Sequence, residues 1–209
     1  MSQNSELLEL NELQSEALKE ILNMGAGRAA ASLSMLTGEH FLLRVPSVAF
    51  YTVEELEQQT VQGDHNRAIM LHLGGDLNGF TSLVFSLISA KRLLANTMDM
   101  EASDEEIAVL ADSALMEIGN VVVGAIVGVF ANSLGLGLQY SAPTLLEGSI
   151  SELTRTGAIG KNFQILVAKL TFVDRSGQSE GYFMMVFDVA SVEMITPSLD
   201  GFLESQGLL

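Results

Sequence analysis

Two long segments carry hydrophobic residues every three or four positions, the spacing that places them on one face of an α-helix. This periodicity predicts helices near residues 6–36 and 104–134. Ser103 and Glu106 predict a capping box at the start of the second helix. Gly38 and Gly135 predict the C-caps of the two helices, because glycine readily adopts the left-handed conformation found there.

Shorter apolar runs bounded by glycine and polar residues predict the strands. FLLRVPSVAF and LGLQYSAPTLL each read as a strand with a proline inside it, which predicts an edge position or a bulge. RAIMLHL and GFTSLVF predict a β-hairpin, and FQILVAKLTFV and GYFMMVF predict a second one. Residues 86–97 and 188–204 predict closing helices, the latter interrupted near Pro197. The predicted class is α+β, with about six mostly antiparallel strands and long helices packed on the sheet.

The chain also repeats itself. An offset of 97 residues aligns Glu20 with Glu117, Asn23 with Asn120, Gly27 with Gly124, and Pro46 with Pro143. After the hairpins the offset becomes 102, so that Gly79 aligns with Gly181. We therefore predict a single domain over residues 1–209, built from repeats at about 6–100 and 103–209 that are related by a pseudo-twofold axis.

One segment raises the alternative of a membrane helix. No charge lies between Glu117 and Glu147, and the run is long enough to span a bilayer. However, Asn120 and Asn132 would lie in hydrocarbon, both flanks are acidic, and no basic residue anchors either end. The matching helix of the first repeat is not free of charge, since it carries Arg28. We expect a buried helix and no membrane insertion.

Composition narrows the classes of function. The 209 residues are 48% hydrophobic, enough for a sizeable core, and 26 acidic residues against 10 basic ones give a net charge of −16. This charge argues against a nucleic acid or an anionic lipid surface as a partner. The absence of cysteine excludes disulfides and thiolate sites. His40, His65 and His72 lack metal-ligand spacing, so we expect no metal site. The acidic N-terminus is unlike a secretory signal, so we expect a cytoplasmic protein.

Polar residues of each long helix fall on one narrow stripe. At 3.6 residues per turn the members of each stripe span an arc of about 60°. The first stripe is Glu16, Glu20, Asn23 and Gly27, and the second stripe is Ser113, Glu117, Asn120 and Gly124. The residues predicted to face the core lie opposite: Leu18, Ile21, Leu22, Gly25, Ala29, Leu33 and Leu36, and Leu115, Ile118, Val122, Ile126 and Phe130.

Each stripe is either an ordinary solvated helix face or a functional site. A gene duplication copies the one as readily as the other, so the repetition alone does not decide between them. However, asparagine is a weak helix former and a mid-helix glycine costs about 1 kcal/mol relative to alanine. Both repeats keep these unfavourable residues on the stripe, and residues that break local rules often mark function.

The pattern [Asp/Ser]-x3-Glu-x2-Asn-x22-Pro resembles the active-site motif of the CheC/CheX/FliY family of chemotaxis phosphatases. The second copy matches throughout, at Ser113, Glu117, Asn120 and Pro143. The first copy matches at Glu20, Asn23 and Pro46, with Glu16 in place of Asp or Ser. Two motif copies resemble CheC more than CheX, which keeps one.

The resemblance implies dephosphorylation of a phosphorylated response regulator such as CheY. Asn23 and Asn120 would orient the attacking water, and Glu20 and Glu117 would contact the regulator's lysine. The remaining stripe residues (Glu16, Gly27, Ser113 and Gly124) would contact or make room for the partner, and Pro46 and Pro143 would shape the strands. The regulator would supply Mg²⁺, so no cofactor of the chain's own is expected. We hypothesise that both sites act and that the second is stronger.

A non-catalytic alternative remains at this point. CheC-like proteins resemble one another in binding the receptor deamidase CheD, so the chain would then be a regulatory binding module. A scaffold in another two-component pathway is a third hypothesis. Binding of a deamidase without hydrolysis of an acyl phosphate would favour the non-catalytic interpretation.

Overall fold

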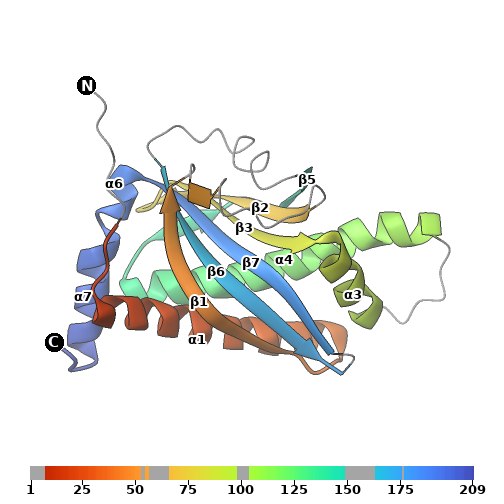
Figure 1. The fold of residues 1–209 in the computed structure, drawn as a ribbon, viewed down its shortest axis with the longest axis horizontal. Coiled ribbons are helices and arrows are strands. Elements are labelled where there is room, and N and C mark those ends of the chain that lie inside the picture. Colours follow the sequence, from red (N-terminus) through yellow and green to blue (C-terminus); the bar gives the residue numbers. More distant parts are fainter. Residues whose placement is uncertain (1–7, 53–54, 57–65, 98–103, 149–162, 176) are drawn as a thin grey trace.

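The computed structural model describes residues 8–52, 55–56, 66–97, 104–148, 163–175 and 177–209 (Figure 1). The helices are α1 (Glu12–Thr37), α3 (Leu87–Thr97), α4 (Asp104–Leu134), α6 (Val189–Val192) and α7 (Ile195–Ser205). The strands are β1 (Leu42–Thr52), β2 (Asn66–Gly75), β3 (Gly79–Ser86), β4 (Leu138–Tyr140), β5 (Thr144–Gly148), β6 (Phe163–Asp174) and β7 (Gly177–Asp188).

The ends of the long helices follow from their caps. The side chain of Asn11 accepts a hydrogen bond from the Gln14 N–H (2.9 Å), and the Gln14 side chain accepts one from the Asn11 N–H (3.0 Å). This capping box begins α1 at Glu12, so the prediction of a start near residue 6 was wrong. The two predicted C-caps are confirmed, because Gly38 and Gly135 have φ values of 74° and 67°. The predicted cap at Ser103 lies outside the described residues.

All strand pairs form one antiparallel sheet in the order β1-β6-β7-β3-β2-β4, and β5 also pairs with β2. The first strand of each repeat pairs with the hairpin of the other repeat: β1 lies beside β6, and β4 and β5 lie beside β2. The two hairpins meet at the centre, where β3 pairs with β7. The predicted α+β class and both hairpins are confirmed, and the exchange of strands ties the two repeats into one sheet.

The prolines interrupt the two exchanged strands to different degrees. In β1 the register with β6 shifts between Arg44 and Ser47, around Pro46, and β1 is an edge strand. Both expectations for this proline are therefore confirmed. The second segment was predicted as one strand, but it is split into β4 and β5 with Pro143 in the gap. Proline has no N–H to donate to the sheet, so pairing with β2 stops there.

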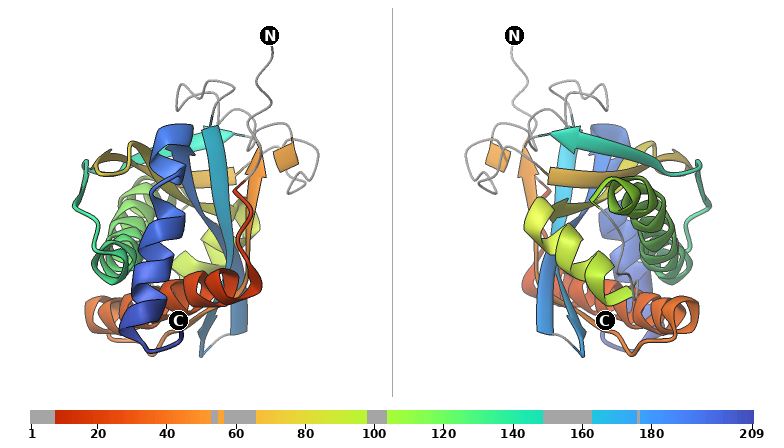
Figure 2. Two further views of the ribbon diagram at one scale, coloured as in Figure 1. Left: turned by 90° about the vertical axis from the view of Figure 1, so that its left-hand side faces the viewer. Right: turned by 90° about the vertical axis from the view of Figure 1, so that its right-hand side faces the viewer.

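The long helices lie on the same side of the sheet (Figure 2). They contact each other, and their apolar faces share the main core with alternate residues of the strands. At Gly25 an added Cβ would lie 2.8 Å from the Ile126 Cα, so glycine permits the close contact of α1 with α4. Segment Ala111–Leu134 is long and apolar enough to cross a membrane, with a mean hydropathy of 2.0, yet it packs here as a core helix.

The closing helix is interrupted at residues 193–194, so the predicted interruption near Pro197 is confirmed. Pro197 itself lies in the first turn of α7, where a missing N–H costs little. Leu36 was predicted to face the core, but it is 49% exposed. It lies in the last turn of α1, where the chain reverses at Gly38 and the buried Phe41 packs into the core.

Candidate functional site

The two predicted stripes face solvent. Glu16, Glu20, Gly27, Ser113 and Glu117 are exposed. The two asparagines and Gly124 are partly buried. The residues predicted to lie opposite are buried on both helices, apart from Leu36. Each stripe therefore presents an acidic side chain and, about one helical turn away, a carboxamide that is partly sheltered by its neighbours.

The carboxamide of Asn23 is bound to the backbone of β1. Its Oδ1 accepts a hydrogen bond from the Val45 N–H (2.9 Å), and its Nδ2 donates to the Val45 carbonyl (3.3 Å) and to the Lys19 carbonyl (3.0 Å). Val45 lies where β1 loses register with β6. Asn23 thus provides the hydrogen bonds that the neighbouring strand does not.

This contact explains the spacing between Asn23 and Pro46 in the first copy of the motif. Pro46 lacks an N–H and interrupts β1, which leaves the polar groups of Val45 to be satisfied elsewhere. The asparagine on the facing helix supplies a donor and an acceptor at that point. This role was not predicted from the sequence, although the fixed distance between the two residues was a sign that helix and strand meet there.

The second carboxamide is in a different state. The side chain of Asn120 forms no hydrogen bond with any part of the chain that the structure describes. Ala142, which aligns with Val45, accepts a hydrogen bond from the Ser141 hydroxyl (2.9 Å) instead. Asn120 therefore keeps both donors and its acceptor available on an exposed helix face.

The glycines of the helices have two different explanations. Gly25 is required by packing, as described above. In contrast, a Cβ at Gly27 or Gly128 would meet nothing within 4 Å. Close helix packing therefore does not require glycine at either position. At Gly124 a Cβ would lie 3.1 Å from the hydroxyl oxygen of Tyr140.

The two stripes also differ in the charged residues that flank them. The first stripe is flanked by Lys19 and Arg28, and the second repeat has Met116 and Ala125 at the matching positions. The helix of Glu117 therefore lacks the cations that flank the first stripe on the helix of Glu20. Among the described residues, no group of three or more His, Asp or Glu side chains is placed to hold a metal ion.

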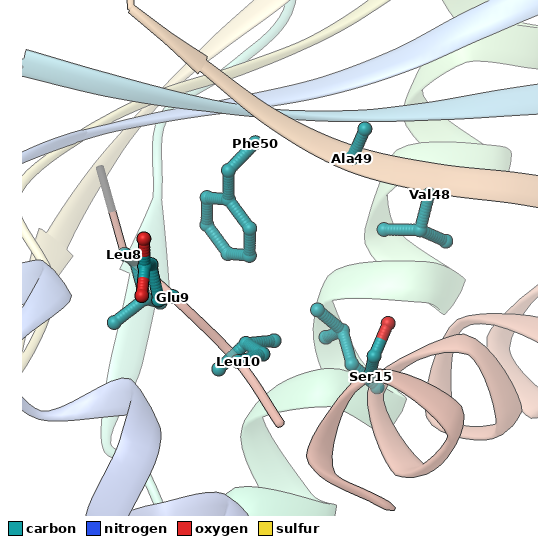
Figure 3. A pocket seen from close by; sticks show the side chains of 8 residues that line it. Leu8, Glu9, Leu10, Ser15, Val48, Ala49 and Phe50 are labelled. Carbon is teal, nitrogen blue, oxygen red and sulfur yellow. The ribbon is translucent and has the colours of Figure 1, made fainter. Parts of the chain in front are cut away.

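One groove lies beside the start of α1 (Figure 3). It has a volume of about 290 Å³ and lies between residues 8–10, the first turns of α1 and β1. Its lining is mostly apolar, with Glu9 and Ser15 as the polar side chains. None of the stripe residues lines this groove, so it is separate from both candidate sites.

Comparisons with known proteins identify the relatives of the chain. The family model described as chemotaxis phosphatase CheX matches residues 67–164, a range that contains the second motif copy only. The CheY-P phosphatase CheC of Bacillus subtilis (strain 168) is 26% identical over 204 residues, covering 91% of this chain and 95% of that protein. Both matches support the resemblance of the chain to the CheC/CheX/FliY family.

The fold of the chain is also found in solved structures. FliY of Thermotoga maritima superposes with a TM-score of 0.72 at 17% identity, covering 93% of this chain and all of that one. The middle domain of FliM from H. pylori superposes with a TM-score of 0.62 at 15% identity, covering 90% of this chain and 99% of that one. Because proteins with different names share the fold, the function has to be argued from the site.

Proposed function

We propose that the second stripe, on α4, hydrolyses the aspartyl phosphate of a CheY-like response regulator. The observation that carries the proposal is the free carboxamide of Asn120, next to the exposed Glu117. The printed name of the Bacillus subtilis relative, a CheY-P phosphatase, supports the reaction class. The match of the CheX model to the segment that contains this stripe supports the choice of copy.

The chemistry needs a positioned water rather than a strong base. Asn120 accepts a hydrogen bond from the water and keeps an N–H free to bind it or a phosphoryl oxygen. The water attacks phosphorus in line with the bond to the regulator's aspartate. A P–O bond forms from the water, the P–O bond to the aspartate breaks, and the aspartate leaves as a carboxylate. The protons of the water pass to the phosphate oxygens and the solvent. Placement of this kind accounts for most of the catalysis of phosphoryl transfer.

Glu117 has a positioning role in this proposal. It lies three residues before Asn120, about one helical turn away and on the same side of α4. A carboxylate there pairs with a lysine beside the phosphoryl group of the regulator, which fixes the docked orientation. The regulator brings its own Mg²⁺ to neutralise phosphate charge, and the reaction takes place in the cytoplasm.

The first stripe is proposed to be the weaker site. Both N–H groups of Asn23 are in use, so it cannot donate to water or phosphate without releasing a backbone carbonyl. Each hydrogen bond contributes about 1 kcal/mol. Opening the contacts with Val45 therefore reduces the fraction of competent molecules by one to two orders of magnitude.

Phosphate release from phosphorylated CheY tests the proposal. We expect Asn120→Ala to remove most of the activity, Asn23→Ala to remove little of it, and the double variant to be inactive. Asn132→Ala is the matched control, because Asn132 is an exposed asparagine near the end of the same helix. A double variant with the wild-type rate would refute the catalytic role of both asparagines. Binding of a CheD-type deamidase by such a protein would then favour the regulatory alternative.

A further inference from the structure

A tyrosine lies beside the second stripe and has no role in the motif. Tyr140 ends β4 and is 49% exposed. Its hydroxyl oxygen lies over Gly124, 3.1 Å from the point that a Cβ there would occupy. Gly124 is one helical turn beyond Asn120, so the phenol lies next to the proposed site on the side away from Glu117.

The backbone holds this tyrosine firmly in place. Tyr140 pairs with Leu73 of β2. The next residue, Ser141, donates its N–H to the His72 carbonyl (3.0 Å) and accepts the His72 N–H on its hydroxyl (3.0 Å). A side chain with only two rotatable bonds on so fixed a backbone is well suited to contact a partner at low entropic cost.

The hydroxyl has no partner within the part of the chain that the structure describes. The first repeat has nothing comparable, because its matching residue is Leu43, which is 3% exposed and belongs to the core. Tyr140 is therefore not an inherited packing residue of the repeated unit. The replacement of a buried leucine by an exposed phenol at the second site calls for an explanation outside the fold.

We propose that Tyr140 is a docking residue of the second site, whose hydroxyl donates a hydrogen bond to the phosphorylated regulator. The inference rests on the proposed function. Glu117 and Tyr140 then contact the regulator on opposite sides of Asn120. Together they set the angle at which the Asn120 carboxamide approaches the phosphoryl group of the regulator. A Cβ at Gly124 would lie 3.1 Å from the phenol oxygen, so the phenol would have to shift by a few tenths of an ångström.

The test uses the Asn23→Ala background, in which the second site acts alone, with phosphorylated CheY of Bacillus subtilis as the substrate. For Tyr140→Phe we expect KM to rise about three- to tenfold, as for the loss of one hydrogen bond, with kcat within twofold. Tyr140→Leu, the residue of the first repeat, and Gly124→Ala should raise KM similarly. Tyr51→Phe is the control, since Tyr51 lies on β1 and is partly buried against the smaller cluster of buried residues that contains Leu56 and Met70.

Affinity for CheY loaded with beryllofluoride and Mg²⁺ separates docking from chemistry. It should fall for Tyr140→Phe by the same factor as KM rises, while the melting temperature stays unchanged. An unchanged KM, or a loss confined to kcat, would overturn the assignment of Tyr140. If Asn120→Ala were also fully active in this background, the proposed function itself would fail. If Asn120→Ala were inactive and Tyr140→Phe were normal, the inference about Tyr140 alone would fail.

Discussion

The two motif asparagines should differ in what they contribute to stability. Asn23 satisfies the N–H and the carbonyl of Val45, whereas Asn120 forms no such contact with the described residues. Replacing each asparagine by alanine gives a matched pair. Both residues lie in the interior of a long helix and are partly buried, so the gain in helix propensity is similar and cancels in the comparison.

The difference can be estimated from the hydrogen bonds. Asn23→Ala removes the two bonds to Val45, and each contributes about 1 kcal/mol to stability. The third bond, to the Lys19 carbonyl, adds little, because that carbonyl also lies within the helical hydrogen-bonding pattern. We therefore expect Asn23→Ala to be about 2 kcal/mol less stable than Asn120→Ala. For a chain of this length the gap corresponds to about 4–8 °C in Tm.

Thermal and urea unfolding of the two variants measure this gap directly. Asn120→Ala should unfold at or slightly above the wild-type temperature, since alanine is the better helix former. Equal stability of the two variants would refute the inference that Asn23 supports the interrupted strand. It would also remove the physical reason for ranking the second site above the first.

Two further predictions concern the helix glycines and salt. Gly27→Ala should stabilise the chain by up to about 1 kcal/mol in urea unfolding, because a Cβ there meets nothing within 4 Å. Gly25→Ala should destabilise it in the same assay, because its Cβ would lie 2.8 Å from the Ile126 Cα; effects of the same sign would contradict this account of the two glycines. Stopped-flow association with an acidic regulator should become faster as salt rises, because the net charge of −16 repels it. Faster association at low salt would show instead that local cations such as Lys19 and Arg28 dominate.

Much of the fold could be predicted because its determinants are local and periodic. The helix period placed the stripes opposite the core, the duplicated pattern gave paired hairpins, and Gly38 and Gly135 marked the helix ends. The exchange of first strands between repeats could not be predicted, because strand pairing is a long-range property that no local pattern encodes. Leu36 was misplaced for a similar reason, since periodicity continues to the end of a helix while the core beneath it does not.

The site was predictable at the level of which residues take part, but not of how they differ. The sequence treats Asn23 and Asn120 as equivalent, with only Glu16 and Ser113 to distinguish their motifs. Their different hydrogen bonding depends on whether the proline-interrupted strand stays within reach of the helix. β1 continues past Pro46 and keeps Val45 near Asn23, whereas the second strand breaks at Pro143 and Ala142 bonds locally to Ser141.

The central claim is that the carboxamide of Asn120 positions the attacking water. It is tested most directly by single-turnover dephosphorylation of phosphorylated CheY with Asn120→Ala in excess, so that binding is saturated. We predict a rate about 10- to 100-fold below that of the wild type, because the second site loses its aligned polar group while the weaker first site keeps the remaining activity. Affinity for beryllofluoride-loaded CheY should be unchanged. A single-turnover rate within twofold of the wild type would contradict the claim.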